Sequence, residues 1–170
     1  MTASDDAIFR RLLDFREDVF AVCLGMARNA SDAEDLCHDV FLKAFARTDG
    51  IRRPGALRVW LLRIARTTCL DHHRRRRRLS TVSVEDLPES STADIRTPAS
   101  ISAAAEDVRR LKDAIARLPR KQREVLVLRE YGELSYEDLS RTLNLRPGTV
   151  MSRLNRARLA VASAMEESHD

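Results

Sequence analysis

SYEDLSRTLNLRPGTVMSRLNRAR, residues 135–158, is the stretch of sequence that predicts the fold most directly. Ser135 begins a helix-capping motif, because its hydroxyl can accept a hydrogen bond from a backbone N–H of the first helical turn. The spacing of apolar residues predicts helices at about 135–143 and 147–165, joined by residues 144–146. Pro147 suits the first turn of the second helix because its φ angle is already helical. Two short helices joined by a tight turn predict a helix-turn-helix.

The second of these helices has two chemically different faces. One face is apolar and can pack on the first helix through Leu139 and Leu143; it carries Val150, Leu154, Ala157 and Val161. The other face carries Thr149, Ser152, Arg153 and Arg156. Arginine can bind guanine edges or phosphates, and short hydroxyl side chains fit close to DNA. The pattern therefore favours a helix that lies in the DNA major groove, and the alternative is an ordinary solvated helix face.

The N-terminal half of the sequence also predicts helices. Apolar residues recur at helical spacing from Ile8 to Met26, and Ser31 has the form of a second capping box. The helix that Ser31 would start continues to about Arg47, and a loop with Gly and Pro follows at residues 48–55. A third helix is expected from about Ala56 into the arginine run at 74–78, with Trp60 on its apolar side.

Composition favours an all-α fold and excludes several other classes. The 170 residues are 44% hydrophobic and 33% charged, but only 5% aromatic, with five Gly and five Pro, which disfavours a turn-rich β fold. No apolar run approaches the roughly 20 residues that cross a bilayer, so we expect no membrane insertion and a cytoplasmic location. The three cysteines have no paired spacing that would predict a disulfide framework or a zinc site, and each fits a small core position.

Charge is distributed unevenly along the chain. Residues 1–73 carry 11 basic and 11 acidic side chains, and residues 74–78 are all Arg. Residues 79–107 then carry one Arg and six acidic residues, whereas residues 108–170 carry 13 basic and nine acidic residues. We therefore expect two small helical domains, at 1–78 and 104–170, joined by a flexible acidic linker at 79–103.

Blocks of sequence in both halves resemble one known family. SYEDL at 135–139 and GTVMSRLNRAR at 148–158 resemble the promoter-reading domain of extracytoplasmic-function (ECF) sigma factors, the smallest of the bacterial sigma-70 class. DAEDLCHDVFLK at 32–43 is similar to the polymerase-binding helix of that family. WLLRIAR at 60–66, with LDHH at 70–73 and the arginine run, is similar to its promoter-melting helix. The blocks follow the order that they have in the family.

The resemblance implies a protein that binds bacterial core RNA polymerase, directs it to promoter DNA and helps the promoter to open. It implies polymerase binding by Asp35, Asp39, Phe41 and Lys43. It implies promoter melting by Arg63, Arg66, Thr67, Asp71, Arg74 and Arg75, with the loop at 48–56 holding the opened DNA. It implies recognition of an upstream promoter element by Arg146, Gly148, Thr149, Ser152, Arg153 and Arg156. An anti-sigma factor is an expected further partner, and no metal, cofactor or catalytic residue is expected.

Three positions depart from the family pattern. Arg146 stands where a serine usually caps the recognition helix, so that cap is lost, and a phosphate contact by Arg146 would be one compensation. Met151 stands where a lysine is common, which removes one phosphate contact. His38 replaces a common glutamine on the polymerase-binding helix.

Two other functions compete with this interpretation. A metal-dependent nuclease would need ligands such as Cys69, Asp71, His72 and His73, but the sequence has no HExxH and no second Cys/His pair. A stand-alone helix-turn-helix regulator is the stronger alternative, because the C-terminal half alone would suit it. The block at 32–43 is the feature that favours a sigma factor instead.

Overall fold

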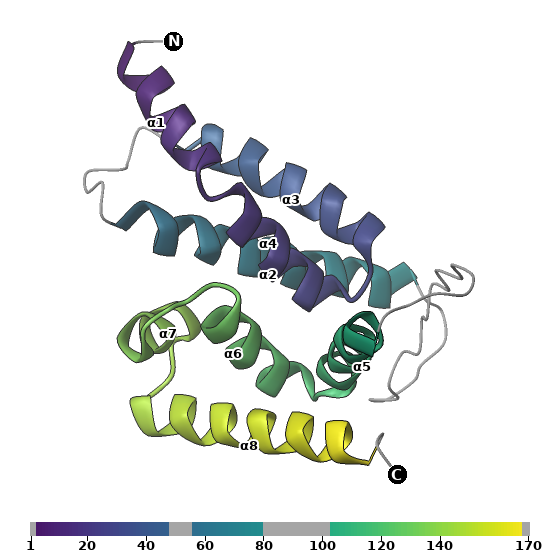
Figure 1. Cartoon of the computed structure of the whole chain (residues 1–170). Coiled ribbons are helices and arrows are strands. Elements are labelled where there is room, and N and C mark those ends of the chain that lie inside the picture. The colour runs from purple at the N-terminus through teal and green to yellow at the C-terminus, as the bar shows by residue number, and fades with distance from the viewer. Residues whose placement is uncertain (1–2, 48–55, 80–102, 168–170) are drawn as a thin grey trace.

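The computed structural model describes residues 3–47, 56–79 and 103–167, and the elements in these ranges are eight α-helices (Figure 1). In the N-terminal half these are α1 (Ala3–Leu13), α2 (Arg16–Ala27), α3 (Ala30–Phe45) and α4 (Leu57–Leu79). In the C-terminal half they are α5 (Ala103–Arg117), α6 (Arg120–Glu130), α7 (Tyr136–Leu143) and α8 (Pro147–Glu166). The prediction of an all-α fold is confirmed. The loop at 48–55 and nearly all of the expected linker, residues 80–102, lie outside the described residues.

The N-terminal half differs from the prediction in two details. The apolar stripe from Ile8 to Met26 is divided between α1 and α2, because the helix breaks at Asp14 and Phe15. The predicted cap at Ser31 is wrong. Asn29 is the cap, because its backbone is extended and its side-chain oxygen accepts a hydrogen bond from the N–H of Asp32 at 2.8 Å. Ser31 therefore lies inside the first turn of α3.

The core of this half forms where α2, α3 and α4 pack together. Val19, Val40 and Leu61 are fully buried there. The three cysteines, Cys23, Cys37 and Cys69, are also buried, as their apolar spacing predicts. The Sγ atoms of Cys23 and Cys69 are 3.9 Å apart, and the contact with the Cys69 thiol together with burial raises the pKa of Cys23, so this thiol stays protonated.

The C-terminal half contains the predicted helix-turn-helix in α7 and α8. The hydroxyl of Ser135 accepts a hydrogen bond from the N–H of Asp138 at 3.1 Å, and Asn144 ends α7 in the left-handed region, with φ of 52°. Pro147 begins α8, and Arg146 at its N-cap makes no side-chain capping bond. The predicted apolar face of α8 is buried at Val150, Leu154 and Ala157, in one core with Leu139 and Leu143 of α7.

The two halves pack against each other. Helix α2 contacts α5 and α6, and α4 contacts α7. Helix α8 lies at the edge of the molecule, separated from α4 by the layer of α6 and α7 (Figure 1). None of the described helices is long and apolar enough to span a bilayer.

Candidate nucleic-acid and polymerase interfaces

The predicted DNA-binding residues of α8 lie at its start and on its outer face, where solvent reaches them. Arg146, Gly148, Ser152 and Arg156 are exposed, and Thr149 and Arg153 are partly exposed. A side chain at Gly148 would meet no heavy atom within 4 Å, so the backbone at the start of α8 is accessible. The structure therefore brings all six predicted residues to one exposed end and face of α8.

The arginines of α8 fall into two groups. Arg158 is held by Glu130 of α6, with Nη2 2.6 Å from the carboxylate oxygen, so it links the surfaces of α8 and α6. Arg153 and Arg156 have no ion pair or hydrogen bond among the described residues. Because their charges are not neutralised within the described part of the chain, they remain available to bind phosphates or guanine edges.

Sequence reasoning did not select Asn155 of α8. This side chain is exposed and lies beside Ser152 on the surface of the helix, on the side away from Arg156. An amide can form a bidentate contact with adenine, so Asn155 has the chemistry for base recognition. Its position three residues from Ser152 is the signal in the sequence that could have identified it.

The predicted melting residues follow one exposed face of α4, with one exception. Arg63, Thr67, Asp71 and Arg74 are exposed and lie at intervals of three and four residues. Arg74 is 3.4 Å from Asp71, in an ion pair between two exposed side chains. Arg66 points elsewhere, because its guanidinium donates to the carboxylate of Glu124 in the opposite half. The structure therefore groups four of these residues and separates Arg66 from them.

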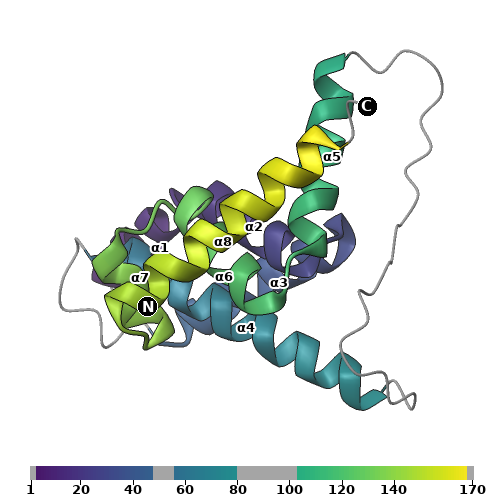
Figure 2. The ribbon, with the colours of Figure 1, turned by 90° about the horizontal axis from the view of Figure 1, so that it is seen from below.

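The arginine run at 74–78 continues α4 as helix. Arg76 is 2.9 Å from Asp32, which also lies 3.5 Å from the Nε2 atom of His72. Arg75 is exposed, and no ion pair holds it within the described ranges. Figure 2 shows this end of α4 projecting from the molecule. The projecting cations can reach DNA phosphates without rearrangement of the core.

Two ionisable groups beside this end of α4 have shifted pKa values. Burial alone would raise the pKa of Asp32, but the Asn29 amide and the charges of His72 and Arg76 hold it below its usual value. Burial lowers the pKa of His73, and the charges of Arg123 and Arg28 act in the same direction. A hydrogen bond between its Nε2 atom and the carbonyl of Met26, at 3.1 Å, partly opposes this shift. His73 is therefore neutral near pH 7.

The exposed face of α3 differs in part from the predicted polymerase-binding set. Asp35 and Asp39 are exposed, as a docking surface requires. Phe41 is only 7% exposed and belongs to the core, and Lys43 donates to the hydroxyl of Thr68 at 3.0 Å. Leu42 instead shares the outer face with the two carboxylates and is 53% exposed. Its i, i+3 and i+7 spacing from Asp39 and Asp35 is the signal that could have identified it.

Comparison with known proteins assigns both halves. The protein-family model for sigma-70 region 2 matches residues 12–79. The protein-family model for sigma-70 region 4 matches residues 109–161. The chain is 30% identical over 162 residues to the RNA polymerase sigma-H factor of Pseudomonas aeruginosa, with 91% of this chain and 84% of that protein covered. It is 31% identical over 145 residues to the ECF RNA polymerase sigma factor EcfG of Rhodopseudomonas palustris, with 85% and 77% covered.

A solved structure agrees with this assignment. The fold matches that of the sigma factor RpoE from Bartonella quintana, which was crystallised in complex with the anti-sigma factor NepR. The TM-score is 0.73 at 26% sequence identity, with 92% of this chain and 95% of that chain covered. The chain belongs to the ECF sigma factors of the bacterial sigma-70 family.

Proposed function

We propose that this sigma factor, which directs RNA polymerase to promoters, divides the task between its two halves. The N-terminal half binds the core enzyme through α3 and holds opening DNA along α4, and the C-terminal half reads an upstream promoter element through α8. We propose domain boundaries at 1–78 and 104–170, with the linker at 79–103 between them. The family consists of transcription initiation factors, so the polymerase supplies the chemistry, and the cytoplasm is the expected location.

The exposed face of α3 carries the strongest support for polymerase binding. Leu42 is a large apolar side chain that is 53% exposed beside the carboxylates of Asp35 and Asp39. An apolar residue surrounded by charge is the arrangement of a hot spot in a protein–protein interface. We propose that Asp35, Asp39 and Leu42 dock on a basic surface of the polymerase, with Phe41 and Lys43 supporting the helix from inside.

The DNA-binding proposal rests on exposed cations, most of which form no ion pair within the described ranges. Arg153 and Arg156 on α8 would contact base edges or phosphates, with Asn155 beside Ser152 on the same exposed surface, and Arg146 would contact the backbone at the start of the helix. Arg63, Thr67, Asp71 and Arg74 on α4, with Arg75 beside them, would follow the promoter segment that melts. An anti-sigma factor is a further proposed partner, because the similar Bartonella protein was crystallised with one.

A stand-alone regulator remains the second candidate, because α7 and α8 alone suit it. Capture of the chain on immobilised core RNA polymerase, without DNA, distinguishes the two functions. Leu42→Lys should weaken capture roughly tenfold or more, because it removes an apolar contact and places a positive charge against the basic surface of the polymerase. Met151→Lys is the matched control, since Met151 is 59% exposed but lies on α8. Failure of the unmodified chain to bind polymerase would favour the regulator.

A further inference from the structure

Met151 of α8 is a large apolar side chain that the fold leaves in solvent. It is 59% exposed, whereas Val150 beside it is fully buried and Leu154, one turn later, is 2% exposed. The core of the C-terminal half therefore does not depend on the side chain at position 151. Single apolar residues are common on protein surfaces, so the place of Met151 on the helix decides what it can contact.

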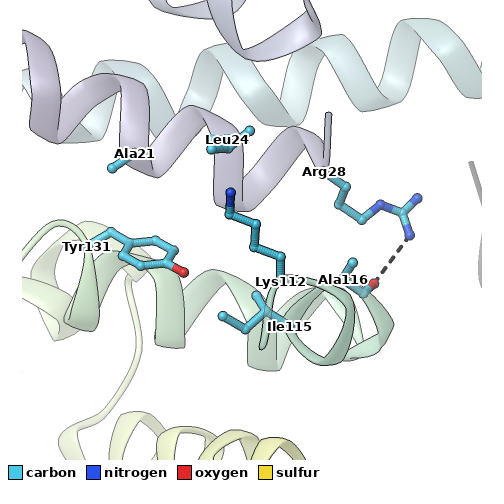
Figure 3. Close-up of a pocket in the computed structure, with 8 residues that line it drawn as sticks. Ala21, Leu24, Arg28, Lys112, Ile115, Ala116 and Tyr131 are labelled. Carbon is cyan, nitrogen blue, oxygen red and sulfur yellow. Dashed lines mark hydrogen bonds between the residues drawn. The ribbon is translucent and has the colours of Figure 1, made fainter. Parts of the chain in front are cut away.

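The cavity between the two halves does not receive this side chain. The cavity has a volume of about 200 Å³ and lies between α2, α5 and α6, where Figure 3 shows Lys112 extending toward α2 beside Tyr131. None of the residues that line it belongs to α8. Met151 therefore stays on the surface of α8, and a contact that covers it must come from outside the described part of the chain.

Met151 lies on one flank of α8, and two arginines lie toward the other. Successive residues of a helix are about 100° apart, so Met151 and Asn155 are about 40° apart around the axis and about 6 Å apart along it. Arg153 and Arg156 are roughly 140–160° away from Met151 around the same axis. Gly148, Met151 and Asn155, which are all exposed, form the uncharged flank of α8.

A helix that lies in the major groove brings both of its flanks against the DNA. A helix with its side chains is about 10–12 Å across, and the major groove is about 12 Å wide. Residues near the N-terminus of a recognition helix reach base edges, and Met151 lies in the first half of α8. The arginines can bind phosphates or guanine, whereas the uncharged flank offers no charge to a phosphate. It can therefore meet the bases only through apolar contacts or an amide.

Base edges in the major groove present one apolar group, which is the C5 methyl of thymine. Against an apolar side chain, the amino group of cytosine would lose water without gaining a hydrogen bond. Methionine is long and unbranched, so its thioether end can adjust to the position of a methyl group. Asn155, about one turn away, can bind adenine through its amide. Both side chains of the uncharged flank therefore favour A·T base pairs.

We infer that Met151 is a specificity-determining residue of this sigma factor and contacts the C5 methyl of a thymine in the upstream promoter element. The inference rests on the proposed function, because it requires α8 to lie in the major groove of that element. Burial of one methyl or methylene group favours binding about fourfold. Loss of the thymine methyl at one position of the element should therefore weaken binding by about that factor.

Deoxyuridine in place of thymine tests this inference, because it pairs with adenine in the same way and lacks only the C5 methyl. The probe is a promoter that the holoenzyme, formed from core polymerase and the full-length chain, selects from randomised promoters. Each thymine of its upstream element is replaced in turn on either strand, and the affinity of the holoenzyme for each duplex is measured. One replacement should weaken binding by the unmodified chain about fourfold.

Variants of the chain assign that methyl group to Met151. Met151→Ala should bind the thymine and deoxyuridine duplexes equally at this position, because both changes remove the same contact. Met151→Leu keeps an apolar side chain and should keep part of the difference. Leu159→Ala is the matched control and should keep all of it, since Leu159 is 60% exposed and lies about 12 Å further along α8.

Folding does not confound this experiment. Deoxyuridine leaves the protein unaltered, and Met151 and Leu159 are both more than half exposed. Circular dichroism and urea unfolding should therefore give the same helix content and stability for every variant, within experimental error.

Three results would overturn the inference while the selected promoter still supports the proposed function. These are an upstream element without thymine, equal binding of all deoxyuridine duplexes by the unmodified chain, and a difference that Met151→Ala retains. Weaker capture of Met151→Ala on immobilised polymerase without DNA would also overturn it, because Met151 would then contact a protein. Selection of no promoter would count against the proposed function itself, and the inference would fail with it.

Discussion

Arg153 and Arg156 make the sharpest functional prediction for single residues. Arg153→Ala and Arg156→Ala should each weaken promoter use by about 1–3 kcal/mol if these side chains read bases, and each should relax selectivity at particular promoter positions. Transcription from a set of promoters with single base changes measures both effects. Arg158→Ala is the matched control, because Glu130 holds Arg158 within the protein. Unchanged promoter preference in both variants would mean that α8 reads DNA through another face.

The buried side chain of His73 should make the free energy of unfolding depend on pH. Burial, followed by the charges of Arg123 and Arg28 and of the neighbouring His72, places its pKa in the folded protein below the usual value near 6.5. The unfolded chain therefore binds the proton more readily. The free energy of unfolding should fall as the pH drops below about 6.5, toward the lower pKa of the folded state. Above that range His73 is neutral in both states and makes no such contribution.

Urea unfolding at pH 7.5 and pH 5.5 measures this effect. His73→Gln keeps an N–H group that can donate to the Met26 carbonyl but cannot be protonated in this range, so it should lose part of the pH dependence. Equal pH dependence in the variant and the unmodified chain would assign the effect to other groups.

The arginines show what can be predicted from the sequence: the face of a helix on which a side chain lies, but not its partner in a distant helix. Helical spacing placed Arg153 and Arg156 on the open face of α8, and it placed Val150 and Leu154 inside. Spacing within α4 could not predict the fate of Arg66, because its partner Glu124 lies 58 residues away in another helix. Side chains that pair across long sequence separations depend on tertiary packing, which no local pattern records.

Substitutions at the N-caps of α7 and α8 should change the stability of the folded chain in opposite directions. Ser135→Ala removes the bond to the N–H of Asp138 and should lower the free energy of unfolding by about 1 kcal/mol. Arg146→Ser adds a capping hydroxyl at the start of α8, where Arg146 makes none, and should raise it by up to about 1 kcal/mol. Chemical denaturation of the full-length chain measures both changes. A destabilising Arg146→Ser would show that Arg146 stabilises the turn in another way.

The segments predicted to be helical are helical in the structure, but some helices begin or end at other residues than predicted. The starts of the two helices of the helix-turn-helix could be predicted from Ser135 and Pro147. Serine is strongly preferred at helix N-caps, and proline is preferred in the first helical turn. In the N-terminal half, Asn29 and Ser31 are both good capping residues, and the sequence did not distinguish them. The extended backbone at Asn29 decides the outcome, and this conformation depends on how α2 ends at Arg28 in the left-handed region.

At the scale of the whole molecule, the uneven charge predicted two helical units but not how they pack. The close approach at Gly25 depends on one missing side chain opposite Val127. The polar contacts across the interface join residues that are 58, 75 and 88 positions apart. The exposed face of α3, which we propose binds polymerase, also differs from the set of residues predicted from the sequence. Packing of α3 on the core buries Phe41 and leaves Leu42 exposed.

Transcription by reconstituted holoenzyme on a library of randomised promoters tests the central claim most directly. We predict that the chain co-elutes with bacterial core RNA polymerase and initiates transcription from a defined subset of the library. Arg153→Ala should change the selected upstream element. Sequence-specific binding to DNA without co-elution, and without initiation from any promoter in the library, would contradict the account.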